Sequence, residues 1–194
     1  FLYPNADSKT NSPNCYTNEI VIPVSSVSDG SKVAKSIQLK TVRNPLILPF
    51  DNWLYFKVYC GSIQAEAFLK VLYDFTQEPE ISRLIKSFFF IRYADPKHHL
   101  RIRFFNDNGN DLDKLKGYFL SKLGALSVNG NLYSVSIDTY EREVERYGEG
   151  VLMDYSEMLF WHDSIAVLEF IYNQSKLDNE LNRLLFAINS INVI

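Results

Sequence analysis

WLYFKVYC, at residues 53–60, is aromatic and β-branched with a single charge, and this composition predicts a buried strand. Ser62 follows as the expected N-cap of a helix over residues 63–75, whose apolar residues recur every three or four positions. Pro79 is expected to end that helix by residue 78, because a proline inside a helix removes a hydrogen bond and clashes with the preceding turn. A strand and an amphipathic helix therefore begin the fold.

The residues after this helix continue the alternation of helices and strands. A short helical stretch is expected at residues 81–86, two strands with a hairpin-like connection at residues 88–93 and 100–105, a helix at residues 111–123 and a strand at residues 132–140. The order strand, helix, strand, strand, helix, strand is that of the split βαβ arrangement. The sequence therefore predicts an α+β fold with a ferredoxin-like βαββαβ core.

Additional C-terminal helices are expected after this core. Residues 153–172 and 180–191 are both apolar on a broad face, which predicts two packed helices. The second helix runs into the apolar end Ile191-Asn192-Val193-Ile194. We therefore expect a truncated domain whose C-terminal part is missing.

The N-terminal segment differs in composition from the rest of the chain. Residues 4–18 and 25–36 are rich in small polar residues and flank one expected strand at residues 20–24. We expect residues 1–50 to be the tail of a preceding domain, or a linker, with that one strand, and residues 51–194 to be the main domain. The first residue is not methionine, which indicates that the chain begins inside a longer protein.

Composition excludes several classes of protein. The 194 residues suffice for one globular domain with its own core. The 20 Lys and Arg residues and 23 Asp and Glu residues give a net charge of −3, which argues against binding to the phosphate backbone of nucleic acids. No apolar stretch reaches the roughly 18 residues of a membrane span. Two cysteines, Cys15 and Cys60, are too few for a disulfide scaffold or a four-ligand zinc site, so the cytoplasm is the expected compartment.

Two arginines lie on the strand predicted at residues 100–105. Side chains alternate along a strand, so Arg101 and Arg103 share one face about 7 Å apart and can act together on an anion. Residues 92–105 contain four basic residues and one acidic residue, a net charge of +3. The alternative is a solvated sheet face whose charges are balanced by nearby acids, and this is the commoner arrangement.

A second charged cluster complements the basic strand. Residues 138–149 contain five acidic residues and two arginines, a net charge of −3. Either the two clusters pair with each other and satisfy Arg101 and Arg103 structurally, or the basic face is left for a ligand. The residues alone leave both alternatives open.

The histidines do not form a site of their own. His162, Asp163 and Ser164 are adjacent, and adjacent residues on a helix point about 100° apart, so they cannot form a catalytic triad. A hydrogen bond to a neighbouring helix, or an interruption of the helix itself, is expected at Asp163 or Ser164 instead. His98 and His99 lack companions at metal-ligand spacing. We expect neither a metal nor another cofactor.

Four motifs occur in order along the chain: WLYFKVYCG at residues 53–61, FFFIRYADPKHHLRIRFF at 88–105, YEREVERYG at 140–148 and SEMLFWHDS at 156–164. Together they resemble the C-terminal, glutamate-eliminating region of class I lanthipeptide dehydratases, the large enzymes of lantibiotic and thiopeptide biosynthesis. Residues 18–23 resemble the tail of the preceding, glutamylating domain of that family.

The resemblance implies a two-stage dehydration of a precursor peptide. In the family, the N-terminal domain uses glutamyl-tRNA to esterify Ser or Thr hydroxyls with glutamate, and the C-terminal domain eliminates that glutamate to give dehydroalanine or dehydrobutyrine. Elimination needs stabilisation of an enolate and a site for the departing carboxylate, and arginines suit both tasks. The catalytic residues that the resemblance implies are Arg101, Arg103, Glu143 and Arg146. The last two lie together if residues 140–147 contain one helical turn.

The same resemblance leaves alternatives for the activity. The family's elimination domain also uses a histidine far downstream, and none of His98, His99 and His162 matches its position. We therefore expect the chain to be part of a lyase-type lantibiotic dehydratase. The resemblance leaves open whether this part eliminates glutamate on its own. The alternatives are a non-catalytic peptide-binding or assembly remnant and the pyridine-forming cyclisation domain of thiopeptide pathways.

Partners and a compartment also follow from the resemblance. The expected partner is a lantibiotic precursor peptide, and glutamyl-tRNA is a partner only through the missing N-terminal domain. A homodimer is expected for the full-length enzyme. A complex with a membrane-associated cyclase and transporter is a further alternative, which would place a cytoplasmic protein at the membrane surface.

Overall fold

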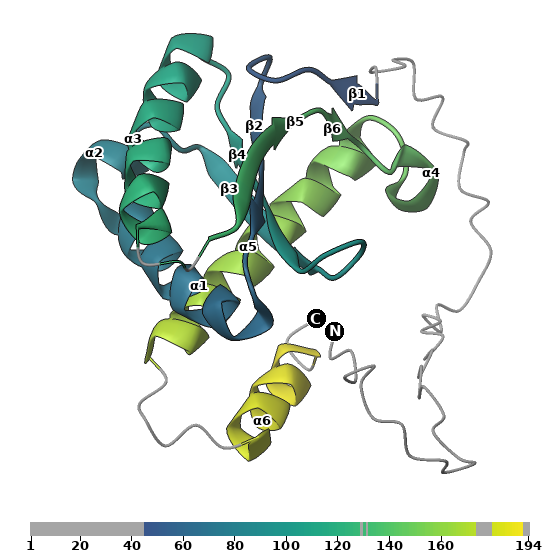
Figure 1. Cartoon of the computed structure of the whole chain (residues 1–194). Helices are drawn as coiled ribbons and strands as arrows, with labels where there is room; N and C mark the ends of the chain where they lie inside the picture. Colours follow the sequence, from purple (N-terminus) through teal and green to yellow (C-terminus); the bar gives the residue numbers. More distant parts are fainter. Residues whose placement is uncertain (1–44, 129, 131, 174–179, 192–194) are drawn as a thin grey trace, which may run out of the picture. The chain divides into compact units, whose positions relative to one another are not determined.

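The computed structural model (Figure 1) describes residues 45–128, 130, 132–173 and 180–191. The chain divides into two compact units, residues 1–38 and 39–194, and the first lies wholly outside the described residues. The polar loops and the strand that the sequence predicts before residue 37 therefore lie outside them too.

The core elements follow the predicted order strand, helix, strand, strand, helix, strand, and each lies close to its predicted range. They are β2 (Trp53–Tyr59), α1 (Ser62–Gln77), β3 (Ser87–Tyr93), β4 (His99–Phe105), α3 (Gly109–Ser127) and β5 (Ser134–Asp138).

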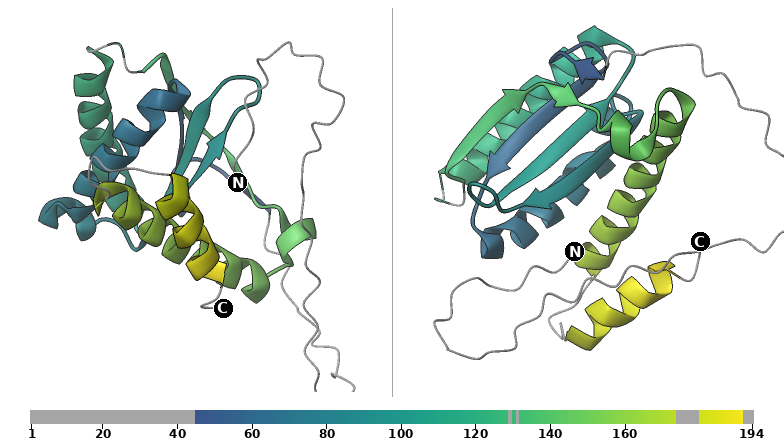
Figure 2. Two further views of the ribbon diagram at one scale, coloured as in Figure 1. Left: turned by 90° about the horizontal axis from the view of Figure 1, so that it is seen from below. Right: turned by 90° about the vertical axis from the view of Figure 1, so that its right-hand side faces the viewer.

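The four strands form one antiparallel sheet in the order β3-β4-β2-β5. Because β4 pairs antiparallel with both β2 and β3, these two strands run parallel on either side of it, and α1 connects them. Figure 2 shows α1 and α3 together on one face of this sheet. The opposite face is left to other segments of the chain.

The alternation of side chains along β2 and β4 divides the sheet into two faces with different chemistry. Phe56 and Ile102 are partners across the two strands and are fully buried in the core under α1 and α3. Tyr55 and Arg103 are also partners, and they point to the opposite face. There Tyr55 joins a smaller aromatic cluster that includes Trp53. One face is therefore apolar, and the other combines rings with charges.

The strand predicted at residues 132–140 is split in two, so the expectation of one continuous strand was wrong. β5 ends at Asp138, and β6 (Tyr140–Glu141) pairs instead with β1 (Leu46–Ile47) in a separate two-stranded sheet. The side-chain oxygen of Asp138 accepts a hydrogen bond from the backbone N–H of Thr139 at 2.8 Å. This local bond uses the backbone N–H of Thr139, the residue that separates β5 from β6.

The start of α1 also differs from the expectation. Its N-cap is Gly61, and Ser62 is already the first helical residue, so the prediction of Ser62 as the N-cap was wrong. Gly61 is extended and makes no side-chain capping bond. Pro79 does mark the end of α1, and it begins α2 (Pro79–Ser82), where the missing N–H of proline costs no hydrogen bond.

The remaining helices of the described chain are α4 (Val144–Tyr147), α5 (Val151–Asn173) and α6 (Glu180–Ile191). Helix α5 packs against β3 and α1, as Figure 2 shows. Ser164, buried within α5, accepts a hydrogen bond from the backbone N–H of Phe90 at 3.1 Å. Ser164 therefore bonds to a strand and not to a neighbouring helix, and α5 continues without interruption, so both forms of the expectation for Ser164 were wrong.

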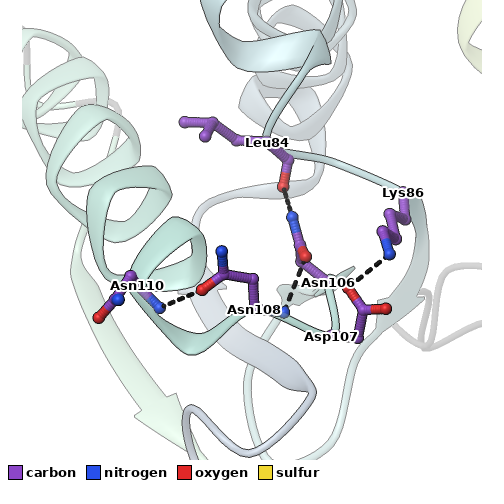
Figure 3. A network of polar contacts seen from close by, with 6 residues as sticks. All are labelled: Leu84, Lys86, Asn106, Asp107, Asn108 and Asn110. Atoms are coloured by element: carbon purple, nitrogen blue, oxygen red, sulfur yellow. Dashed lines mark hydrogen bonds and ion pairs between the residues drawn. The ribbon is translucent and has the colours of Figure 1, made fainter.

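The turn from β4 into α3 is held by asparagine side chains (Figure 3). The Asn106 amide nitrogen donates to the carbonyl of Leu84 at 2.9 Å, and its oxygen accepts from the backbone N–H of Asn108 at 2.9 Å. Asn108 is the N-cap of α3 and accepts from the backbone N–H of Asn110 at 3.1 Å. These bonds fix the end of the strand that carries Arg101 and Arg103.

Candidate functional site

A cavity of about 650 Å³ lies on the face of the sheet that α1 and α3 leave uncovered. Arg101 and Arg103 of β4 line its sheet wall, and Glu143 and Arg146, at the turn of α4, line another wall. The structure therefore brings together all four residues that the resemblance implies. The cavity is also lined by residues that the sequence did not single out, among them Tyr55, Lys57 and Asp138.

Arg103 is a buried cation held among aromatic rings. Only 6% of the residue is exposed, and its guanidinium carbon lies 4.3 Å from the ring centre of Tyr55, 4.5 Å from that of Tyr140 and 5.1 Å from that of Phe89. Burial lowers the pKa of Arg103, while the neighbouring tyrosines oppose that shift. Its Nε–H has no hydrogen-bond partner among the described residues. A buried charge of this kind is costly unless an anion pairs with it.

Arg101 lies beside Arg103 and nearer to solvent. Its guanidinium carbon is 3.6 Å from the ring centre of Tyr93, which is a cation–π contact. Its Nε–H donates to Nε2 of His99 at 3.2 Å. The side chain is therefore fixed in position by a ring and a histidine on the same face of the sheet.

Two acidic residues that line the cavity, Asp138 and Glu143, form ion pairs with cations other than the two arginines of β4. Asp138 forms an ion pair with Lys57 on the neighbouring strand. Glu143 pairs with Arg146. In residues 45–128, 130, 132–173 and 180–191, no ion pair involves Arg101 or Arg103. Of the two alternatives that the sequence left open, the structure favours a basic face that is available to a ligand.

The turn that carries Glu143 and Arg146 is helical, which is the condition under which they lie together. Glu143 is the N-cap of α4, and its carboxylate is 3.6 Å from the Arg146 guanidinium. Both side chains are well exposed, at 62% and 68%. They therefore form an exposed pair of opposite charges that lines the cavity.

Arg142, in the same motif, forms a buried ion pair and does not face solvent as Arg146 does. Its Nε–H and Nη2–H donate to the two carboxylate oxygens of Glu157 at 2.7 Å each, and both side chains are almost fully buried. Glu157 also forms a hydrogen bond with the Tyr140 hydroxyl. Burial raises the pKa of Glu157 and of Tyr140. The pair attaches the segment that carries β6 and α4 to α5.

Sequence reasoning missed several residues of the site, for reasons that the structure explains. Tyr55 and Lys57 lie on β2 and reach the cavity because Tyr55 pairs with Arg103 and Lys57 with Arg101. This register cannot be derived from the sequence of one strand. The sequence analysis included Arg142 only in the net charge of residues 138–149. Its partner Glu157 lies on α5, and the sequence does not show that α5 packs beside Arg142.

No three His, Cys, Asp or Glu side chains among the described residues are close enough to bind a metal ion. None of the helices in the described part of the chain combines the length and the apolar character of a membrane span.

A family model described as lantibiotic biosynthesis dehydratase, C-terminal, matches residues 53–194, which is most of the chain. The match begins at the first residue of β2. It includes all the residues that line the cavity except Pro45 and Leu46.

Curated relatives agree with the family model. The subtilin biosynthesis protein SpaB of Bacillus subtilis is 33% identical over 162 residues, covering 79% of this chain and 15% of SpaB. The nisin biosynthesis protein NisB of Lactococcus lactis subsp. lactis is 34% identical over 121 residues, covering 60% of this chain and 11% of NisB. The chain thus spans less than a sixth of the length of these relatives.

A solved structure shares the fold. The tRNA dependent lantibiotic dehydratase MibB from Microbispora sp. 107891 is similar with a TM-score of 0.59 and 27% sequence identity. The similarity covers 67% of this chain and 13% of MibB. The mixed fold of helices and sheet is therefore that of a region of a lantibiotic dehydratase.

Proposed function

This chain belongs to the family of lantibiotic biosynthesis dehydratase C-terminal domains, and on that basis we propose that its cavity eliminates glutamate from glutamylated Ser and Thr residues of a precursor peptide. The observation that carries the proposal is the buried guanidinium of Arg103, which lines the cavity and has an unpartnered Nε–H. An anionic group of the substrate in the cavity pairs with the charge of this guanidinium.

The proposed reaction moves negative charge onto two groups of the substrate. A base removes the proton from Cα of the modified residue, the electron pair forms the Cα=Cβ double bond, and the Cβ–O bond breaks to release glutamate as a carboxylate. Charge develops first on the carbonyl oxygen beside Cα and then on the leaving carboxylate. Fixed cations stabilise both, because they need no reorganisation during the reaction.

The distribution of charge in the cavity suits a glutamyl group. A glutamate esterified through its α-carboxyl keeps a side-chain carboxylate and an α-ammonium group, so it carries both signs of charge. Arg101 and Arg103 on the sheet wall suit the carboxylates, since a guanidinium binds a carboxylate through two parallel hydrogen bonds. Glu143 on the facing turn suits the ammonium, and Arg146 beside it adds a third cation.

The substrate, the products and the role of glutamyl-tRNA are parts of the same proposal. The substrate is a lantibiotic precursor peptide, and the products are free glutamate and a dehydroalanine or dehydrobutyrine residue. Glutamyl-tRNA is needed only for the earlier esterification, which the proposal assigns to a preceding domain. The elimination itself needs no cofactor.

The test is mass spectrometry of a glutamylated precursor peptide after incubation with this chain. Formation of the dehydro residue together with free glutamate supports the proposal. Retention of the peptide on the protein with no loss of glutamate would instead support a peptide-binding role, and formation of a pyridine ring would support the cyclisation alternative.

A further inference from the structure

We infer that His99 is a positioning residue, which as a neutral imidazole holds the Arg101 guanidinium in the orientation that binds the substrate. The hydrogen bond between His99 and Arg101 supports the orientation of Arg101 without reference to any activity. The identity of what Arg101 binds rests on the proposed function. His99 lies at the first position of β4, two residues before Arg101 and on the same face of the sheet.

Two hydrogen bonds determine which ring nitrogen of His99 carries the proton. Nδ1 lies 2.8 Å from the carbonyl oxygen of Lys97, and a carbonyl only accepts, so Nδ1 carries the hydrogen. Nε2 is then unprotonated and accepts the hydrogen bond from the Nε–H of Arg101 at 3.2 Å. Since the arginine nitrogen only donates, both neighbours select the same neutral tautomer.

The surroundings of His99 hold the ring in place. The residue is buried, and its ring centre lies 4.8 Å from that of Tyr59 on β2 and 5.6 Å from that of Tyr93 on β3. Tyr93 also lies under the Arg101 guanidinium, so one ring contacts both partners. His99 therefore lies against the rings of Tyr59 and Tyr93, and Arg101 lies over the ring of Tyr93.

The charged groups around His99 favour its neutral form. Burial lowers the pKa of His99, and the cations Arg101 on β4 and Lys57 on β2 lower it further. The hydrogen bond to Lys97 and the carboxylate of Asp95 in the connection between β3 and β4 act in the opposite direction. Tyr59 and Tyr93 face the ring with their aromatic surfaces.

This arrangement has a consequence for the cavity. Because Nε–H of Arg101 is used by His99, the terminal nitrogens of the guanidinium are left to bind a carboxylate. Protonation of His99 would turn Nε2 into a donor that faces another donor, and would add a like charge beside Arg101. The hydrogen bond would be lost, and with it the orientation of the guanidinium.

The first test is independent of any activity. In a nitrogen-15 NMR titration of the histidine-labelled chain, His99 should be neutral with the proton on Nδ1 near pH 7, and its pKa should lie below the usual histidine value of about 6.5. A proton on Nε2, or a pKa of His99 at or above the usual histidine value, would overturn the inference.

The second test uses the elimination reaction with His99→Gln and His99→Ala, and with His98→Gln as the matched control. Glutamine keeps an acceptor that does not titrate, so this variant should retain most of the rate and should lack the decline at acidic pH that we expect for wild type. Alanine should lower the rate by about tenfold to hundredfold, since a misplaced catalytic group has effects of that size. Equal rates for the Gln and Ala variants, or an acidic decline that persists in His99→Gln, would overturn the inference.

These outcomes separate the inference from the proposed function. If Arg101→Ala eliminates as fast as wild type, the proposed role of Arg101 fails, while the NMR titration still decides whether His99 is the neutral acceptor. If Arg101→Ala is slow and the His99 variants behave as wild type at every pH, only the positioning role fails.

Discussion

Arg142 and Glu157 form a bidentate ion pair with both nitrogen–oxygen distances at 2.7 Å, and this buried pair attaches the segment carrying β6 and α4 to α5. Arg146, in the next turn of the same motif, is 68% exposed. The two arginines of the YEREVERYG motif at residues 140–148 therefore have different tasks. Arg142 holds the segment in place, and that placement presents Glu143 and Arg146 to the cavity.

Removing one member of this pair should destabilise the fold strongly. Arg142→Ala leaves the Glu157 carboxylate buried without its cation, and we expect the free energy of unfolding to fall by about 3–5 kcal/mol. Urea denaturation followed by circular dichroism measures this. The double variant Arg142→Met with Glu157→Leu removes both charges and should recover most of the loss. A single variant as stable as wild type would contradict the structural role.

The exposed pair should behave in the opposite way. Because exposed ion pairs contribute about 1 kcal/mol or less, Glu143→Gln and Arg146→Ala should change the free energy of unfolding very little. Both should nevertheless slow the elimination of glutamate. Parallel denaturation curves and rate measurements check this, and a large loss of stability with an unchanged rate would reverse the assignment of the two pairs.

Stability should depend on pH through His99. Burial lowers its pKa in the folded protein, so below about pH 6.5 the unfolded chain binds a proton that the folded chain does not. The free energy of unfolding should therefore decrease as the pH falls from 7.5 through 6.5 toward the lower, folded-state pKa. His99→Gln should be free of this part of the decrease, and His98→Gln should retain it. Equal pH dependence in all three proteins would contradict the prediction.

The turn before α3 should depend on the side chain of Asn106. Asn106→Ala removes the donor to the Leu84 carbonyl and the acceptor for the backbone N–H of Asn108 in a buried setting. We expect a loss of about 1–3 kcal/mol of unfolding free energy, the cost of leaving buried polar groups without partners. Asn110→Ala is the control, because the capping bond uses only the backbone N–H of Asn110.

Much of the fold could be predicted from local patterns in the sequence. Alternation and helical periodicity located β2, β3, β4, α1, α3, α5 and α6 because each of these elements is long enough to show its period. The break between β5 and β6 could not be predicted, since β6 is only two residues long and pairs with a strand of the same length far away in the chain.

The candidate site was predictable only where one strand or one turn contained it. Arg101 and Arg103 share a face because of the period of a strand, and Glu143 and Arg146 meet within one helical turn. The three aromatic rings around the Arg103 guanidinium come from three different elements. The spacing of residues in the sequence does not show that these rings pack around the same side chain. The role of His99 depends on a bond to Arg101 that only the fold reveals.

The central claim is that the buried charge of Arg103 serves the elimination of glutamate, and the rate of that elimination in Arg103 variants tests it most directly. Time-resolved mass spectrometry of a glutamylated precursor peptide would compare wild type, Arg103→Ala, Arg103→Lys and the exposed control Arg92→Ala. The account predicts dehydro-residue formation by wild type and by Arg92→Ala, a fall of about 10²–10³-fold for Arg103→Ala, and a smaller fall for Arg103→Lys, which keeps the charge without the fork. Equal rates for wild type and Arg103→Ala, or no elimination by the folded wild-type chain, would contradict it.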